Sequence, residues 1–93
     1  MSDAAVLERR GRVAVITLNR PEAMNAVDSA LSSAVGAALE ELANDPELRV
    51  GVITGAGRAF CAGADLKALA QGRDISDPQH PEYGFAGLVQ HFV

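Results

Sequence analysis

Two apolar runs rich in β-branched residues are the clearest pattern along the chain. Residues 13–18 read Val-Ala-Val-Ile-Thr-Leu and residues 50–54 read Val-Gly-Val-Ile-Thr, and turn-forming residues follow each run. β-branched side chains favour the extended backbone of a strand, and a short continuous apolar run is typical of a strand that is buried. The first run is therefore predicted to be a buried strand, and the second run is predicted to be the next strand.

Between these runs, apolar residues recur at three- and four-residue spacing, which is the pattern of one buried helix face. Asp28 stands where a side chain can cap the first turn, and Asn-Asp-Pro at residues 44–46 ends the pattern. A strand, a helix and a strand in this order predict one right-handed βαβ unit with parallel strands. The apolar positions of the predicted helix are Leu31, Val35, Ala38, Leu39 and Leu42.

The remainder of the chain is more broken. Residues 65–71 are predicted to form a short helix with Gly72 just past its end, and the Asp-, Pro- and His-containing residues 73–83 are predicted to be a mobile loop. Residues 84–93 again show apolar positions at helical spacing, with no capping residue after them. We therefore interpret residues 1–93 as the N-terminal part of one domain whose C-terminal remainder is missing or lies on a separate chain.

The composition narrows the classes of function. The 93 residues carry a formal net charge of −4, with Lys and Arg scattered among the acids. Nucleic-acid binding depends on clustered positive charge and is not expected. A single cysteine allows no internal disulfide and favours a reducing, cytoplasmic setting. The apolar runs are only a few residues long, so no membrane span is expected.

The most informative segment for chemistry is residues 58–67, Arg-Ala-Phe-Cys-Ala-Gly-Ala-Asp-Leu-Lys. It leads through a bend of small residues into the predicted short helix, whose first N–H groups lack partners within the helix. No side chain in it is an evident nucleophile or base, so the segment is interpreted as half of an oxyanion hole built from main-chain donors. By itself it also fits an ordinary helix start capped by Asp65.

Other candidate groups have simpler interpretations. Cys61 is expected to be a small buried hydrophobe, because Arg58 is the one nearby basic residue that could activate it. His80 and His91 do not have the spacing of metal ligands and are expected at the surface. The serines near the start of the predicted helix are expected to satisfy backbone donors there. These serines are Ser29, Ser32 and Ser33.

Two motifs in register resemble those of a known family. Residues 18–26 read Leu-Asn-Arg-Pro-Glu-Ala-Met-Asn-Ala, and residues 60–66 read Phe-Cys-Ala-Gly-Ala-Asp-Leu. With the predicted helix and second strand between them, they resemble the N-terminal part of a crotonase-superfamily protein of the enoyl-CoA hydratase/isomerase family. The resemblance implies an α/β fold, the first turns of a crotonase-like ββα spiral, with parallel strands and flanking helices. It also implies assembly into homotrimers or hexamers.

The resemblance further implies a shared chemical step, in which two backbone N–H groups stabilise the enolate oxygen of an acyl-CoA thioester. Ala64 matches the residue that supplies the first N–H group, and Asp65 opens the helix whose positive end faces that oxygen. The CoA thioester is then the substrate, and no separate cofactor and no metal are expected. The positions that match substrate- or CoA-binding residues of the family are Ala23, Met24, Ala62, Gly63, Asp65, Leu66 and Lys67.

Two functions stay open at this point. By the resemblance, the second N–H donor and the hydratase carboxylates belong to a segment that follows residue 93. The chain is then either the N-terminal portion of an enzyme that hydrates enoyl-CoA in fatty-acid metabolism, completed by a complementary C-terminal part, or a truncated, non-catalytic paralogue that acts by association or weak CoA binding. A dinucleotide-binding half-domain is disfavoured because Phe60 occupies the third glycine position of the required fingerprint.

Overall fold

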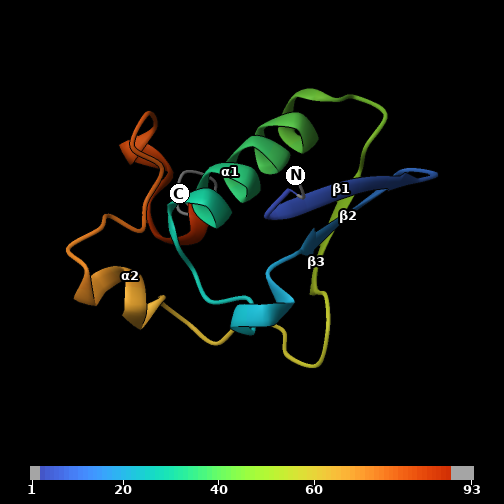
Figure 1. Cartoon of the computed structure of the whole chain (residues 1–93). Coiled ribbons are helices and arrows are strands. Elements are labelled where there is room, and N and C mark those ends of the chain that lie inside the picture. Colours follow the sequence, from blue (N-terminus) through green and yellow to red (C-terminus); the bar gives the residue numbers. More distant parts are fainter. Residues whose placement is uncertain (1–2, 89–93) are drawn as a thin grey trace.

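The computed structural model describes residues 3–88 of the chain (Figure 1). A three-stranded sheet is packed on one side by a long helix, and a short helix lies across the molecule from β1. This arrangement confirms the α/β class and the parallel βαβ unit. The strands and α-helices are β1 (Ala5–Arg10), β2 (Val13–Leu18), α1 (Ser29–Asn44), β3 (Val50–Gly55) and α2 (Leu66–Ala70).

The sheet has the order β1-β2-β3, and its two pairings differ in direction. β2 and β3 run parallel with Ile16 opposite Ile53, as predicted for strands joined by a helix. β1 runs antiparallel to β2, with Ala5 opposite Leu18. This first strand was not among the predicted ones, because its last three residues, Glu-Arg-Arg, hide the short apolar start. Its backbone is held by the neighbouring strand, so pairing rather than apolar content defines it.

The core lies between the sheet and α1. Side chains of β2 alternate between the two faces of the sheet, and Ile16 (0 % exposed) and Leu18 (5 %) point toward the helix. The predicted apolar face of α1 meets them through Leu31 and Val35, which are buried. Asp28 accepts a hydrogen bond from the Leu31 N–H (2.9 Å) and so caps α1 as predicted. α1 therefore has a fixed start next to the turn that follows β2.

Residues 73–83 form the predicted loop, which contains one 3-10 turn and contacts α1 at Ile75 and Tyr83. The Ser32 hydroxyl donates to the Ile75 carbonyl (2.6 Å), so this serine joins the loop to α1 instead of capping it. Asp77 is buried, and the Tyr83 ring is buried against Gly36 of α1. A buried tyrosine and carboxylate anchor the segment, although its composition is that of a loop.

The helical spacing of apolar residues over 84–93 does not produce an α-helix in the part that the structure describes. Residues Phe85–Gly87 form a single 3-10 turn, interrupted by Ala86 with a left-handed φ of 57°. Val89 and Phe92, which completed the predicted apolar face, lie outside the described residues. Among residues 3–88, no helix combines the length and apolar character that crossing a membrane requires.

Candidate functional site

The two motifs that are distant in sequence are hydrogen-bonded to each other. Val27 and Ala64 form an isolated parallel bridge, in which the Val27 N–H donates to the Gly63 carbonyl (2.7 Å) and the Asp65 N–H donates to the Val27 carbonyl (2.8 Å). The Ala62 N–H donates to the Met24 carbonyl (3.0 Å). These hydrogen bonds therefore hold the bend before α2 against the turn after β2.

The backbone N–H of Ala64 makes no hydrogen bond to any residue within 3–88. Its two neighbours in the chain use their polar groups on Val27, and successive peptide groups of an extended segment point in opposite directions. The Ala64 N–H therefore points away from Val27. Ala64 is only half-buried, so this donor is not sealed inside the described part of the protein.

Gly63 is held in a conformation that other residues avoid. Its φ is +102°, and a Cβ added to it would have no heavy atom within 4 Å. The glycine is thus required by the backbone angle and not by crowding from the protein. It turns the chain out of the bridge and leaves open space beside the Ala64 peptide.

Asp65 caps the short helix α2. Its Oδ1 accepts from the Ala68 N–H (3.0 Å), and its Oδ2 lies 3.1 Å from Nη2 of Arg20. The hydrogen bond from Ala68 holds the pKa of the Asp65 carboxyl below its usual value, partial burial opposes this shift, and Arg20 adds to it. Asp65 pairs the N–H of Ala68 in the first turn of α2, and its own N–H donates to the Val27 carbonyl. The Ala64 N–H, one residue before this cap, has no such partner within residues 3–88.

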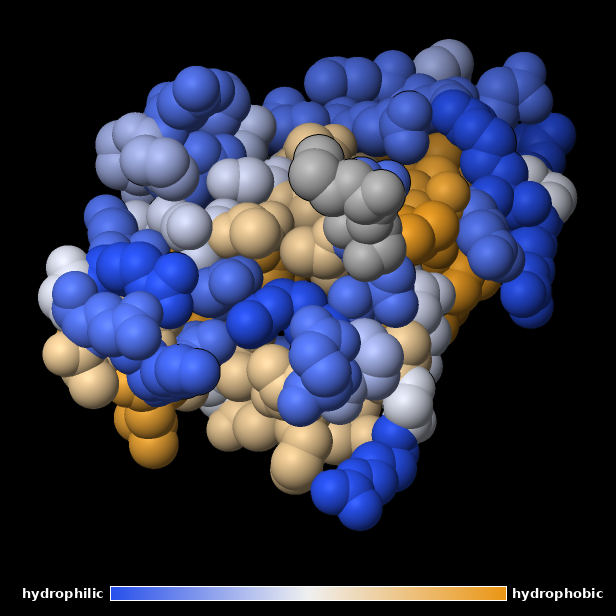
Figure 2. Space-filling model, viewed as in Figure 1, coloured by the Kyte–Doolittle hydropathy of each residue, from blue (hydrophilic) through white to orange (hydrophobic). Residues whose placement is uncertain are grey.

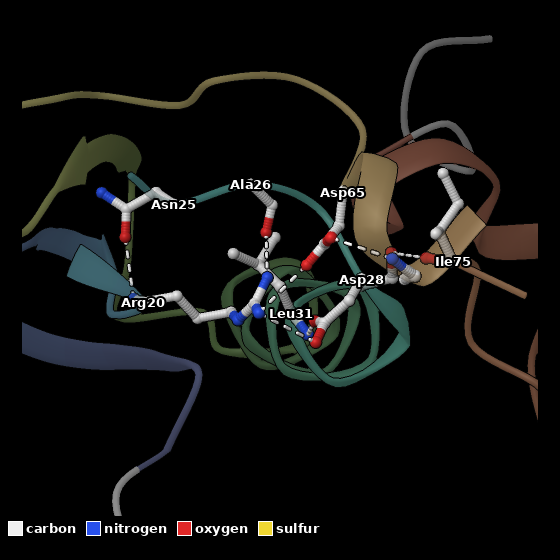
Figure 3. A network of polar contacts seen from close by, with 9 residues as sticks. Arg20, Asn25, Ala26, Asp28, Leu31, Asp65 and Ile75 are labelled. Carbon is white, nitrogen blue, oxygen red and sulfur yellow. Dashed lines mark hydrogen bonds and ion pairs between the residues drawn. The ribbon is translucent and has the colours of Figure 1, made fainter. Parts of the chain in front are cut away.

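Arg20 connects the caps of both helices. Figure 3 shows its guanidinium between the carboxylates of Asp65 and Asp28, with Nη2 at 3.1 Å and 3.4 Å from them. The same guanidinium donates to the Ala26 carbonyl. From the sequence this arginine was identified only as part of the first family motif, although the two capping aspartates indicate a need for a cationic partner. A planar guanidinium with five donors can serve several oxygens at once.

Asn25 is the buried centre of the turn, with no exposed side-chain surface. Its Oδ1 accepts from the Arg20 N–H (2.8 Å), and its Nδ2 donates to the carbonyls of Ala56 (3.0 Å) and Ala59 (2.8 Å). The backbone of Asn25 is left-handed, with φ at 56°, a region in which asparagine is enriched. This structural role of Asn25 was not predicted from the sequence. The available signal was a polar asparagine among the small and apolar residues 23–27.

The remaining predicted site residues fall into two groups. Met24 lies beside the bend, where its carbonyl accepts from the Ala62 N–H, and its side chain is 43 % exposed, whereas Ala23 bonds within its own turn. Leu66 and Lys67 lie on α2, where Leu66 is 77 % exposed. Figure 2 shows hydrophobic residues at the surface, among hydrophilic ones, on the side where α2 lies. A hydrogen bond thus joins Met24 to the bend that precedes Ala64, whereas Leu66 and Lys67 are linked to it through α2.

The remaining candidate side chains, Cys61 and His80, lie in different surroundings. Cys61 is half-buried and accepts a long hydrogen bond from the Gly63 N–H (3.5 Å), so it is less enclosed than predicted. His80 lies 3.2 Å from the Asp77 carboxylate and stacks on Tyr83, with 46 % of its side chain exposed. No group of three or more potential metal ligands occurs among residues 3–88, and these residues enclose no pocket. His91 lies outside the described part.

Comparisons with known proteins cover almost the whole chain. The sequence model of the enoyl-CoA hydratase/isomerase family matches residues 8–91. A carnitinyl-CoA dehydratase of Salmonella enteritidis is 47 % identical over 93 residues, which are 99 % of this chain and 35 % of that protein. The chain therefore spans about a third of the length of such curated relatives.

Solved structures agree with these sequence matches. A carnitinyl-CoA dehydratase from Mycobacterium avium is 59 % identical with a TM-score of 0.94, covering 99 % of this chain and 36 % of that one. A carnitinyl-CoA hydratase from Mycobacterium avium is 58 % identical with a TM-score of 0.92, covering 100 % of this chain and 36 % of that one. In both structures the similarity in sequence and the similarity in fold extend over nearly all of this chain.

Proposed function

Because the chain belongs to the enoyl-CoA hydratase/isomerase family, we propose that it is the N-terminal part of an enzyme that hydrates an enoyl-CoA thioester or dehydrates the corresponding hydroxyacyl-CoA. Its own contribution to the reaction is one oxyanion donor, the backbone N–H of Ala64. The relatives' names assign dehydratase and hydratase activity on carnitinyl-CoA to those proteins. Carnitinyl-CoA and short enoyl-CoA esters of fatty-acid metabolism are therefore the substrates to test.

The observation that carries the proposal is the unpaired N–H of Ala64 between two bonded neighbours. Val27 holds the Gly63 carbonyl and the Asp65 N–H, so the intervening peptide is fixed before any ligand arrives. A donor fixed in advance costs no reorganisation when negative charge develops on a thioester oxygen. Loss of one such donor in other enzymes costs about 2.7–4 kcal/mol of transition-state stabilisation.

The residues around Ala64 have the size and charge needed to bind a thioester and its CoA. Gly63 leaves open space on the ligand side of the bend, and Ala62 adds no bulk. Ala23 and Met24 are proposed to lie along the CoA, and Leu66 to contact the acyl chain or the pantetheine. Lys67 is exposed on α2 and supplies a positive charge suited to a CoA phosphate. CoA enters as part of the substrate and not as a resident cofactor.

The catalytic unit is completed outside this chain. We infer that the second oxyanion donor and the acid–base carboxylates belong to a part of the enzyme that corresponds to the unmatched two thirds of its relatives. That part lies on the same polypeptide or on a complementary one. Homotrimers or hexamers are the assembly expected of the complete enzyme. Within the described residues, Asp28 and Asp65 are engaged with Arg20 as helix caps, and neither is assigned a proton-transfer role.

A hybrid enzyme tests this function. Residues 1–93 replace the matching N-terminal part of the Mycobacterium avium carnitinyl-CoA dehydratase, which is 59 % identical over this stretch. Turnover of carnitinyl-CoA and of a short enoyl-CoA is measured in the hybrid and in two variants, Ala64→Pro and Ala64→Gly. We expect Ala64→Pro to lower kcat about a hundred-fold or more, because proline has no N–H group. Ala64→Gly retains the donor and should stay within a few-fold of the hybrid.

The outcomes separate the two functions that the sequence left open. Full turnover by the Ala64→Pro hybrid would show that Ala64 is not the donor. A hybrid that folds and assembles like the parent enzyme but turns over neither substrate would contradict catalysis and favour the non-catalytic paralogue. Circular dichroism and size-exclusion chromatography establish folding and assembly before each assay.

A further inference from the structure

We propose that Asn25 is the positioning residue that holds the Ala64 donor in place, an inference that deepens the proposed function and rests on it for its catalytic part. Asn25 does not touch the reacting atoms in this scheme. Its buried amide fixes the start of the segment whose end carries Ala64.

The contacts of Asn25 all go to main-chain atoms of other parts of the chain. Its oxygen accepts from the N–H of Arg20, and its nitrogen donates to the carbonyls of Ala56 and Ala59. The Asn25 N–H also donates to the Arg20 carbonyl (2.8 Å), which closes the turn on itself. A side chain that only filled space would not need three polar partners at 2.8–3.0 Å.

These contacts define one end of the segment that carries the donor. Asn25 holds the chain at Ala56 and Ala59, and Val27, two residues later in the same turn, holds it at Gly63 and Asp65. The short stretch between Ala59 and Gly63 is therefore fixed at both ends by one turn. Its direction of entry into the Val27 bridge, and with it the orientation of the Ala64 N–H, depends on the Asn25 anchor.

The chemistry requires an amide at this position. Two carbonyl oxygens point at Nδ2 and one N–H points at Oδ1. An aspartate has the same shape, but it has acceptors on both sides, so a carboxylate oxygen would face the carbonyls of Ala56 and Ala59 without a proton between them. Because the site is fully buried, water cannot separate these oxygens and the segment must move away.

The test uses Asn25→Asp and Asn25→Gly, since both residues tolerate the left-handed backbone at this position. Asn44→Asp, at the exposed end of α1, is the matched control that adds the same charge. The first readout is amide hydrogen exchange in the 93-residue chain. The second is kcat and KM of the hybrid enzyme with carnitinyl-CoA.

In the exchange experiment we expect Asn25→Asp to accelerate exchange at least ten-fold at the N–H groups of Ala62, Val27 and Asp65, which join the two segments. The β1–β2 ladder should keep its protection. A merely structural role would accelerate exchange in the ladder and the junction together. Uniform acceleration, or unchanged protection at the junction, would overturn the proposal.

In the kinetic experiment we expect kcat to fall at least ten-fold in Asn25→Asp and less in Asn25→Gly, with KM changed by less than about three-fold. Asn44→Asp should match the parent hybrid. An Asn25→Asp hybrid with the parent's kcat would refute the positioning role. If the parent hybrid itself is inactive, the proposed function fails while the exchange pattern alone still decides whether Asn25 anchors the segment.

Discussion

The guanidinium of Arg20 lies 3.1 Å from the carboxylate of Asp65, a residue 45 positions further along the chain. The same Nη2 lies 3.4 Å from the carboxylate of Asp28. These two aspartates cap α1 and α2, so a single cation connects the starts of both helices. The two sequence motifs therefore fold as one structural unit, in which the first motif supplies the partners for the second.

The first prediction concerns this cation. Arg20→Lys keeps the charge but removes the planar fork, so one ammonium cannot serve Asp28, Asp65 and the Ala26 carbonyl in the same geometry. We expect the midpoint of thermal unfolding of the chain to fall by about 5 °C. Circular dichroism measures the change. Arg49→Lys, at an exposed position before β3, is the control and should leave the midpoint unchanged.

The second prediction concerns pH. The N–H of Ala68 lowers the pKa of the Asp65 carboxyl, partial burial opposes the shift, and Arg20 adds to it. A carboxyl with a lowered pKa in the folded state stabilises the fold above its unfolded pKa of about 3.9, and this contribution is lost as pH falls through the lower, folded value. Stability should therefore be level from neutral pH to about 5 and decline below about 4.

Asp65→Asn tests this assignment, because an amide does not titrate. We expect the variant to have a lower urea midpoint than the parent chain at pH 7. The difference between the two midpoints should shrink as the pH falls below about 4, where the parent carboxylate becomes protonated. A difference that stays constant down to pH 2 would show that Asp65 does not stabilise the fold through its charge.

Sequence patterns predicted the elements that have their own periodicity. β2, β3, α1 and α2 were all expected, because each has an apolar run, an apolar face or a capping aspartate. β1 was missed because its residues after Leu7 are Glu-Arg-Arg, and a neighbouring strand supplies its hydrogen bonds. Its formation depends on a tertiary contact that no local pattern encodes.

The site was predicted less completely than the fold. Ala64 was singled out from its motif, and the N–H without a partner within 3–88 is consistent with that choice. The roles of Arg20 and Asn25 were missed because each has partners more than 30 residues further along the chain: Asp65 for Arg20, and the carbonyls of Ala56 and Ala59 for Asn25. The segment 73–83 was expected to be a mobile loop, and its composition did not reveal that Tyr83 lies against Gly36 of α1.

The third prediction distinguishes the two faces of β3. Val52 is 44 % exposed on the face turned away from α1, whereas the adjacent Ile53 packs toward the core. We expect Val52→Thr to change the free energy of unfolding by less than about 0.5 kcal/mol and to lower the binding of a hydrophobic dye. Ile53→Thr should destabilise by about 1–3 kcal/mol, because it places a hydroxyl against apolar side chains. Equal losses in both variants would contradict the assigned faces.

The fourth prediction concerns the chain by itself. The structure of residues 3–88 encloses no pocket, and the proposed second donor and the acid–base carboxylates come from elsewhere. The purified 93-residue chain should therefore show no measurable turnover of a short enoyl-CoA, followed by loss of the absorbance of its conjugated double bond. The hybrid enzyme in the same assay is the positive control. Turnover by the chain alone would mean that it contains a complete catalytic site.

The last prediction concerns the contact that holds residues 75–87 on α1. A Cβ added to Gly36 would overlap the ring of Tyr83. In a solvent-exposed helix a glycine-to-alanine change stabilises the fold by about 1 kcal/mol. The sign of the stability change in Gly36→Ala therefore shows whether the Tyr83 ring occupies the space beside Gly36. We expect Gly36→Ala to destabilise the chain by about 1–3 kcal/mol through overpacking.

A double-mutant cycle separates the overlap from other effects. Tyr83→Ala alone should destabilise, because it removes a buried ring. With alanine already at position 83, the added methyl group at position 36 no longer meets the ring, and Gly36→Ala should then be neutral or stabilising. Urea unfolding of the four proteins gives the coupling energy between the two positions. A coupling energy near zero would mean that the Tyr83 ring does not rest on Gly36.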